Sequence, residues 1–110
     1  MERFMKGDIV VVSFPFTNLQ ESKHRPAMVL SNLRGNDLIL CLITSKSRVD
    51  VYSVILKKID FIKGYLKHES VIRPNVLFTI ENSQIRYKIG EVDHKIINAI
   101  NKKLEFIFNL

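Results

Sequence analysis

Cysteine is the scarcest informative residue in this 110-residue sequence, which contains one cysteine, no tryptophan, four glycines and three prolines. A single cysteine excludes an intramolecular disulfide, and with it the class of small secreted domains that disulfides hold together. Cys41 lies inside the apolar run LILCLI, where we expect it to behave as a small buried hydrophobic residue. A cysteine nucleophile needs a nearby base and access to solvent, and the local sequence offers neither.

Metal-ligating side chains and long apolar runs are also sparse. The histidines, His24, His68 and His94, lie far apart in the sequence and share no repeated ligand spacing with the cysteine. We therefore expect no metal and no cofactor. The first twelve residues, MERFMKGDIVVV, lack the features of a secretory signal, and no later run approaches membrane-spanning length. These absences predict a cytoplasmic protein that does not enter a membrane.

Charge of one sign is in modest excess. Seventeen Lys and Arg against eleven Asp and Glu leave a net charge of +6, which favours an anionic partner such as RNA, DNA or an acidic protein segment. The cations are scattered and interrupted by acids, so a solvated basic surface is the alternative. The length, with 46% hydrophobic residues, suits a single domain over residues 1–110.

Short strands are expected over most of the chain. The Val-rich and Phe-rich residues 8–14 predict a strand that Pro15 ends, and a polar loop follows. Pro26 forces Arg25 into extended geometry, so we expect this loop to end at Arg25. The remaining expected strands cover residues 27–31, 38–45, 50–56, 70–73, 75–80 and 86–92.

The pattern changes at two points after the fourth expected strand. Residues 57–69 predict either a short helix or an irregular connection, and residues 81–84 predict a polar turn. From Asp93, a plausible N-cap, apolar residues recur every four positions and predict an amphipathic helix: Ile96, Ile100, Leu104 and Phe108. This order predicts a mainly β fold, a small curved antiparallel sheet or half-open barrel with the helix packed on it.

Several segments in a fixed order resemble the PemK/MazF-type toxins of bacterial toxin–antitoxin pairs. They are GDIVVVSFPFTNLQESKHRPAMVLS, LITS, SVIRPNVLFTIENSQI and IGEV ahead of the terminal helix. The resemblance implies an SH3-like barrel of the CcdB/PemK type with a C-terminal α-helix, and a homodimer. It also implies a ribosome-independent endoribonuclease that cuts single-stranded mRNA at short sequences. The expected partners are single-stranded RNA and a cognate acidic antitoxin encoded upstream.

The resemblance places the family's catalytic arginine on Arg25 and its partner threonine on Thr44. RNA can be cut without metal when its own 2′-hydroxyl attacks the adjacent phosphorus, and a planar guanidinium suits the charge that develops there. The hydroxyl of Thr44 can orient the phosphate or Arg25. Because arginine stays protonated, the identity of the general base is left open.

The rim around these two residues is expected to hold the RNA. Lysines there would contact phosphates and Phe16 could stack on an unpaired base, although each lysine is equally consistent with a solvated charge. His24 could be catalytic, contact phosphate or face solvent, and strand alternation predicts that it does not converge with Arg25. The expected RNA-binding residues are Phe16, Ser22, Lys23, His24, Ser45 and Lys46.

Three questions stay open from the sequence. Val76 stands where many family members have a polar residue that helps to hold RNA, so the recognition sequence is not determined. The chain could instead be a non-enzymatic SH3-like-barrel toxin or binder that acts on gyrase or nucleic acid without cleavage, or a degenerate member that only binds antitoxin. The terminal LEFIFNL predicts either deep packing of the helix or contact with a second subunit.

Overall fold

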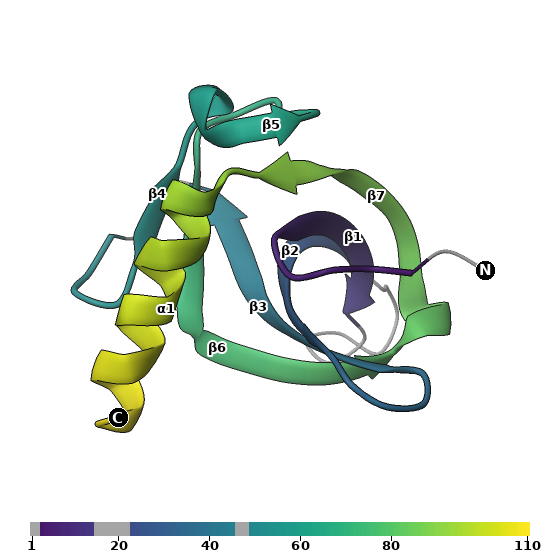
Figure 1. Ribbon diagram of the computed structural model, residues 1–110. Coiled ribbons are helices and arrows are strands. Elements are labelled where there is room, and N and C mark those ends of the chain that lie inside the picture. Colours follow the sequence, from purple (N-terminus) through teal and green to yellow (C-terminus); the bar gives the residue numbers. More distant parts are fainter. Residues whose placement is uncertain (1–2, 15–22, 46–48) are drawn as a thin grey trace.

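Aliphatic and β-branched runs form seven strands that pair into one antiparallel sheet, which curls on itself (Figure 1). The computed structural model of the protein describes residues 3–14, 23–45 and 49–110. The strand order across the sheet is β4-β6-β3-β2-β1-β7-β5. The strands are β1 (Asp8–Phe14), β2 (Lys23–Asn32), β3 (Asp37–Ser45), β4 (Val54–Leu56), β5 (Phe61–Lys63), β6 (Ser70–Glu81) and β7 (Ile85–Val92).

The continuous apolar runs of the central strands are explained by burial on both faces. In β1, Ile9 belongs to one core cluster and Val10 to another, and β3 divides in the same way between Cys41 and Leu40. The first cluster includes the buried residues of the helix, and the second includes Phe4 from the chain start. Strands covered on both sides read as unbroken apolar sequence, which explains the apolar run of the strand predicted at residues 38–45.

The terminal helix α1 (His94–Phe108) lies along β4 and β6 on the outside of the curled sheet (Figure 1). Asp93 is its N-cap, as predicted, and the Oδ1 atom of Asp93 accepts a hydrogen bond from the Ile96 amide at 3.3 Å. Ile96 and Ile100 are buried, whereas Phe108 at the end of the same predicted face is 54% exposed. The sheet therefore covers the first turns of the helix and leaves its C-terminal part open.

The strands differ from the sequence prediction by more than one residue in three places. β2 begins at Lys23 rather than after Arg25, because residues 23–25 pair with residues 12–14 of β1. Residues 50–53 form a turn, in which the amide of Tyr52 and the hydroxyl of Ser53 donate to Asp50 Oδ1. The expected strands 70–73 and 75–80 are one strand, since a register shift between Cys41 and Leu42 of β3 accommodates Pro74 at a bulge.

The connection over residues 57–69 combines both types of structure. It contains a 3₁₀ helix, η1 (Lys58–Asp60), followed by β5, which pairs with β7. The predicted turn at 81–84 is likewise closed by a second 3₁₀ helix, η2 (Asn82–Gln84). Both 3₁₀ helices are single turns, and such short segments carry too few residues for a hydrophobic period.

Gly64 fixes the path of the chain as it leaves β5. Its φ angle is +68°, and a Cβ atom there would lie 2.1 Å from the carbonyl oxygen of Ile89 in β7. Gly90, beside Ile89, is pressed against the same connection, where a Cβ atom would meet the Lys63 carbonyl oxygen. The segment between β5 and β6 is therefore set against β7 by backbone contact, and only glycine fits.

We predict that Gly64→Ala destabilises the protein more than Gly35→Ala. Both glycines have positive φ, which costs an alanine about 1–2 kcal/mol, but no atom lies within 4 Å of a Cβ built at Gly35. The clash with Ile89 should add at least about 1 kcal/mol at Gly64. Urea unfolding at one protein concentration measures both variants, and equal losses would contradict the close contact.

Candidate active site

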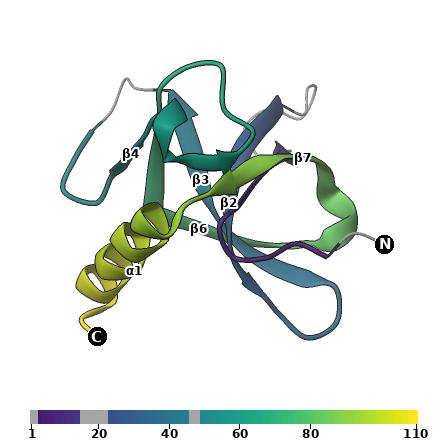
Figure 2. The same ribbon diagram turned by 45° about the horizontal axis from the view of Figure 1, so that its top comes forward.

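The neighbouring strands β2 and β3 place Arg25 and Thr44 at the same end of the sheet. β2 and β3 are antiparallel, and their pairing ends at this side with Ala27 opposite Leu42. Arg25 and Thr44 each lie two residues beyond that last pair. Both residues line one cavity of about 360 Å³. The start of β2, the end of β3 and the connection from β5 to β6 all lie toward the top of Figure 2.

Three elements contribute to this cavity. β2 supplies His24, Arg25 and Pro26, and β3 supplies Ile43, Thr44 and Ser45. The third wall comes from the segment between β5 and β6 and from the first residue of β6, with Leu66, Lys67, His68 and Ser70. Two cations, two imidazoles and several hydroxyl groups therefore surround one space. Such a set of donors suits an anionic group such as a phosphate.

Thr44 is held at the mouth of the cavity by its strand and by its own hydroxyl. Its neighbour across the sheet is Val71 of β6, and the hydroxyl donates a hydrogen bond to the Ser45 carbonyl at 3.1 Å. With its proton engaged, the oxygen retains lone pairs that can accept from a donor in the cavity. Arg25 is partly exposed, so its guanidinium combines a fixed strand position with access to solvent.

The sequence analysis predicted that His24 does not converge with Arg25, and this stays a prediction. Both residues line the same cavity, although they are neighbours on a strand. Lining one cavity does not by itself bring the two side chains together, because alternation sends successive side chains to opposite faces. Ser45, which is exposed, also lines it, as expected for a residue at the rim.

Part of the predicted RNA-binding set falls outside the described residues. These positions are Phe16, Ser22 and Lys46. Lys23 is placed as the first residue of β2, where it pairs with Phe14 of β1. The predicted contacts of these four side chains with RNA stay predictions.

Lys67 and His68 are cavity residues that the sequence analysis did not assign to the site. Both come from the part of residues 57–69 that showed no clear period. Their placement depends on the Gly64 contact with β7 and on the pairing of β6 with β3, and both are long-range features. A lone histidine in a polar stretch carries no local signal of such a position.

An ion pair between the buried Arg73 of β6 and the exposed Asp50 supports the chain that follows β3. Nη2 of Arg73 donates to Asp50 Oδ2 at 3.1 Å, and Arg73 is buried in β6. Hydrogen bonds from Ser53, the Tyr52 amide and Arg73 hold the pKa of Asp50 below its ordinary value. Among the described residues, Nη1 of Arg73 is buried without a hydrogen-bond partner. The pair therefore ties the turn at residues 50–53 to the strand next to Thr44.

Catalysis by a cysteine nucleophile and catalysis by a bound metal ion have little support in the described residues. Cys41 is fully buried, and this burial raises the pKa of its thiol to about 12, which makes it unreactive as a nucleophile. Residues 3–14, 23–45 and 49–110 hold no cluster of three histidine, cysteine or acidic side chains that could bind a metal ion. The same ranges contain no helix that is long and apolar enough to cross a membrane.

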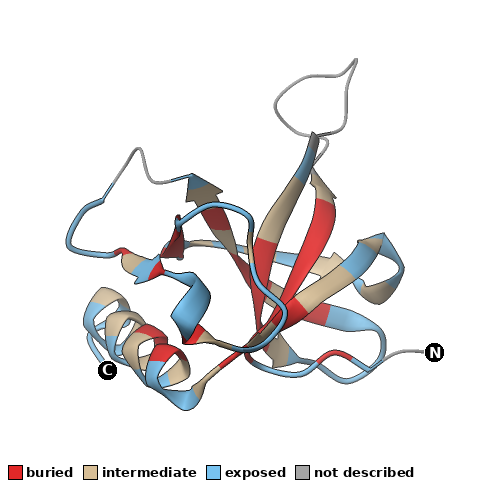
Figure 3. Ribbon diagram, turned by 90° about the horizontal axis from the view of Figure 1, so that it is seen from above, coloured by how far each residue is buried: buried red, intermediate tan, exposed pale blue. Residues whose placement is uncertain are grey.

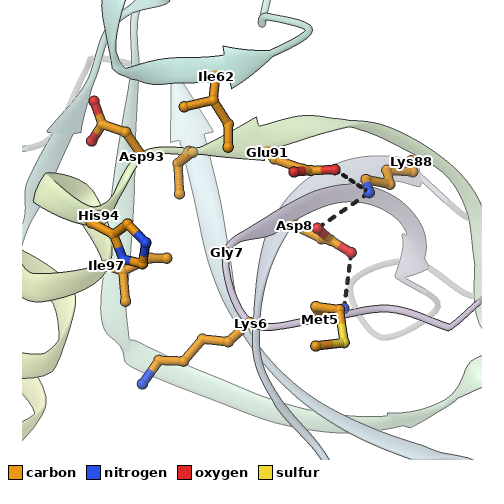
Figure 4. Close-up of a pocket in the computed structure, with 11 residues that line it drawn as sticks. Met5, Lys6, Gly7, Asp8, Ile62, Lys88, Glu91, Asp93, His94 and Ile97 are labelled. Atoms are coloured by element: carbon orange, nitrogen blue, oxygen red, sulfur yellow. Dashed lines mark hydrogen bonds and ion pairs between the residues drawn. The ribbon is translucent and has the colours of Figure 1, made fainter.

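A second cavity of about 270 Å³ lies between the chain start, β7 and the start of α1 (Figure 4). Three of its charged groups satisfy one another: Lys88 Nζ lies 2.8 Å from Glu91 Oε2 and 3.3 Å from Asp8 Oδ1. Asp8 also accepts a hydrogen bond from the Met5 amide at 2.9 Å. These bonds hold the chain start against β7, so we assign this cavity a structural role. The cavity lined by Arg25 is the candidate site.

Comparisons with solved structures agree with the fold. An endoribonuclease in complex with its cognate antitoxin from Mycobacterial species superposes with a TM-score of 0.79 at 16% identity, covering 98% of this chain and 97% of that one. The Mycobacterium tuberculosis toxin MazF-mt6 gives 0.74 at 20% identity, with 94% and 97% covered. MazF from Deinococcus radiodurans gives 0.74 at 20% identity, with 96% of each chain covered.

The sequence itself carries the family signal. A search among curated proteins found no match. Residues 5–108, nearly the whole chain, match the family of PemK-like, MazF-like toxins of type II toxin–antitoxin systems. The match spans β1 to α1 and includes both strands that carry Arg25 and Thr44. The chain therefore belongs to the PemK/MazF toxin family.

Proposed function

We propose that this chain is a single-domain endoribonuclease toxin that cuts single-stranded mRNA through attack by the RNA's own 2′-hydroxyl. The observation that carries the proposal is the shared cavity of Arg25 and Thr44 in a chain of this toxin family. A guanidinium and a hydroxyl at adjacent strand ends can hold one phosphate between them. The structural neighbours named endoribonucleases support the activity.

The cleavage step needs stabilisation of negative charge on the phosphorus oxygens. As the 2′ oxygen bonds to phosphorus and the bond to the 5′ oxygen breaks, charge builds on the two non-bridging oxygens. Arg25 can donate two parallel hydrogen bonds to these oxygens, and Thr44 can position the phosphate or the guanidinium. The products are a 2′,3′-cyclic phosphate and a 5′-hydroxyl. Residues of this chain supply each of these contacts, so the proposal requires no cofactor.

RNA would cross the cavity along its basic rim. His24, Ser45 and Lys67 surround the phosphate position, and Phe16, Ser22, Lys23 and Lys46 extend the proposed surface from neighbouring positions in the sequence. Phosphate contacts fix the register of the strand, whereas base contacts set the recognition sequence. Val76, in the bulged part of β6, therefore bears on specificity rather than on cleavage.

The proposed physiological partner is an acidic antitoxin encoded upstream, and the proposed location is the cytoplasm. One neighbour was solved with its cognate antitoxin, and the net charge of +6 suits an acidic segment here. A disordered acidic segment laid over the Arg25 cavity would block access to RNA.

The C-terminal part of α1 supports the proposal of a homodimer. Phe106, Phe108 and Leu110 are 60%, 54% and 88% exposed. The Phe106 ring lies 6.0 Å from the Tyr52 ring, and Lys103 Nζ donates to the Val51 carbonyl. These contacts place the helix end beside the turn at residues 50–53. Contiguous apolar surface of this kind marks a subunit contact in soluble proteins, whereas deep packing of this segment within one chain is not observed.

Arg25→Lys is expected to lower the cleavage rate at least about 100-fold, because an ammonium group cannot make the paired contact with two phosphate oxygens. The assay follows cleavage of unstructured RNA by purified protein in the presence of a chelator. Arg86→Lys, on the exposed face of β7, is the matched control and should cleave normally. Unchanged cleavage by Arg25→Lys and Arg25→Ala would contradict the catalytic role, and growth arrest by a wild-type protein that cuts no RNA would favour the non-enzymatic alternative.

Phe106→Glu is expected to weaken self-association at least about tenfold, because the charge would be buried in the proposed contact. Light scattering over a range of protein concentrations measures the mass. Ile59→Glu introduces the same charge at an 82% exposed position in η1 and should leave the mass unchanged. A wild-type protein that stays monomeric at every concentration would contradict the homodimer.

A further inference from the structure

We propose that His68 is the general base of the cleavage reaction. The inference rests on the proposed function and adds the general base, which the proposed function does not identify. Arg25 stays protonated and Thr44 is a poor base, so neither can take the proton of the 2′-hydroxyl. A neutral imidazole accepts a proton in the physiological range. His68 brings one to the cavity that Arg25 and Thr44 share.

His68 is held in place from both sides. Its carbonyl accepts a hydrogen bond from Ser70 Oγ at 3.0 Å, and Ser70 is buried at the start of β6 opposite Ser45, the residue after Thr44. On the other side, Leu66 packs against the core cluster that contains the helix residues. The backbone that carries His68 is thus fixed relative to Thr44, while the residue itself is exposed and open to substrate and water.

The structural element that carries each histidine distinguishes His68 from His24, the other histidine of the cavity. His24 and Arg25 come from β2, whereas Lys67 and His68 come from the segment before β6. A phosphate held by Arg25 and Thr44 is therefore flanked by His68 from a separate element. His24 precedes Arg25 on the same strand, so its imidazole and the guanidinium leave the backbone on opposite sides. His24 suits a contact with the RNA backbone, and His68 suits the reacting ribose.

The step balances with water as the only other reactant. His68 takes the proton as the 2′ oxygen forms its bond to phosphorus. The bond from phosphorus to the 5′ oxygen breaks, and this oxygen leaves with the electron pair and takes a proton from water. Protonated His68 then returns its proton to the resulting hydroxide. The neutral imidazole is restored, and nothing is oxidised or reduced.

The test measures cleavage of a randomised single-stranded RNA library between about pH 5 and about pH 8. For wild-type protein, kcat/KM should rise with pH across the acidic part of this range, because a general base acts only when it is unprotonated. His68→Gln should lower the rate by about 100-fold or more and remove this rise. Added imidazole should restore part of the activity of His68→Ala, which a purely structural role does not predict.

Three controls separate a catalytic role from a structural one. His94→Gln makes the same change at an exposed histidine outside the cavity and should keep wild-type activity. Binding of the same library with 2′-O-methyl riboses, measured by fluorescence anisotropy, should change less than about threefold in His68→Gln. His24→Gln should retain the rise with pH even if its overall rate falls.

The outcomes distinguish this inference from the proposed function. A rise with pH that persists in His68→Gln, or that disappears in His24→Gln instead, would overturn the role of His68 while leaving an active ribonuclease. A wild-type protein that cuts no RNA would overturn the proposed function and this inference with it. Loss of the rise in His68→Gln alone, together with imidazole rescue of His68→Ala, would support the assignment.

Discussion

The antiparallel pairing of β2 with β3 is the constraint on which the candidate site depends. It brings the start of one strand beside the end of the other, so Arg25 and Thr44, nineteen positions apart in sequence, line the same cavity. Because β1 and β6 flank this pair and both faces are buried, a shift in register would expose core residues. The packing that stabilises the core therefore also fixes the positions of Arg25 and Thr44. These two partly exposed side chains need no further structural element to hold them at the site.

The third wall of the cavity depends on a different set of contacts. The segment between β5 and β6 leaves β7 at Gly64, where backbone meets backbone, and enters β6 at Ser70 opposite β3. Lys67 and His68 are carried between these two fixed points. A wall anchored at both ends can present charged groups to a phosphate without a large entropy cost on binding. The same arrangement brings the imidazole of His68 to a site whose other main groups cannot accept a proton.

The sequence predicted those features whose signals are local. Apolar runs and the four-residue period gave the strands and the helix, and Pro26 gave the extended geometry of Arg25. The family resemblance then indicated the pairing of Arg25 with Thr44, which no local pattern contains. The errors arose where tertiary contact decides: pairing with β1 extends β2 to Lys23, and a bulge opposite β3 allows β6 to continue through Pro74. His68 was missed for the same reason, since its place is set by β7 and β3 rather than by its neighbours in sequence.

The central claim is that Arg25 and Thr44 hold a phosphate while the RNA's own 2′-hydroxyl displaces the 5′ oxygen. Mass spectrometry of the fragments from a cleaved RNA tests this claim most directly, because it reads the chemistry at the broken bond. The account predicts a 2′,3′-cyclic phosphate on the upstream fragment and a free 5′-hydroxyl on the downstream fragment. A 5′-phosphate on the downstream fragment would show that water attacked the phosphorus, and would contradict the account.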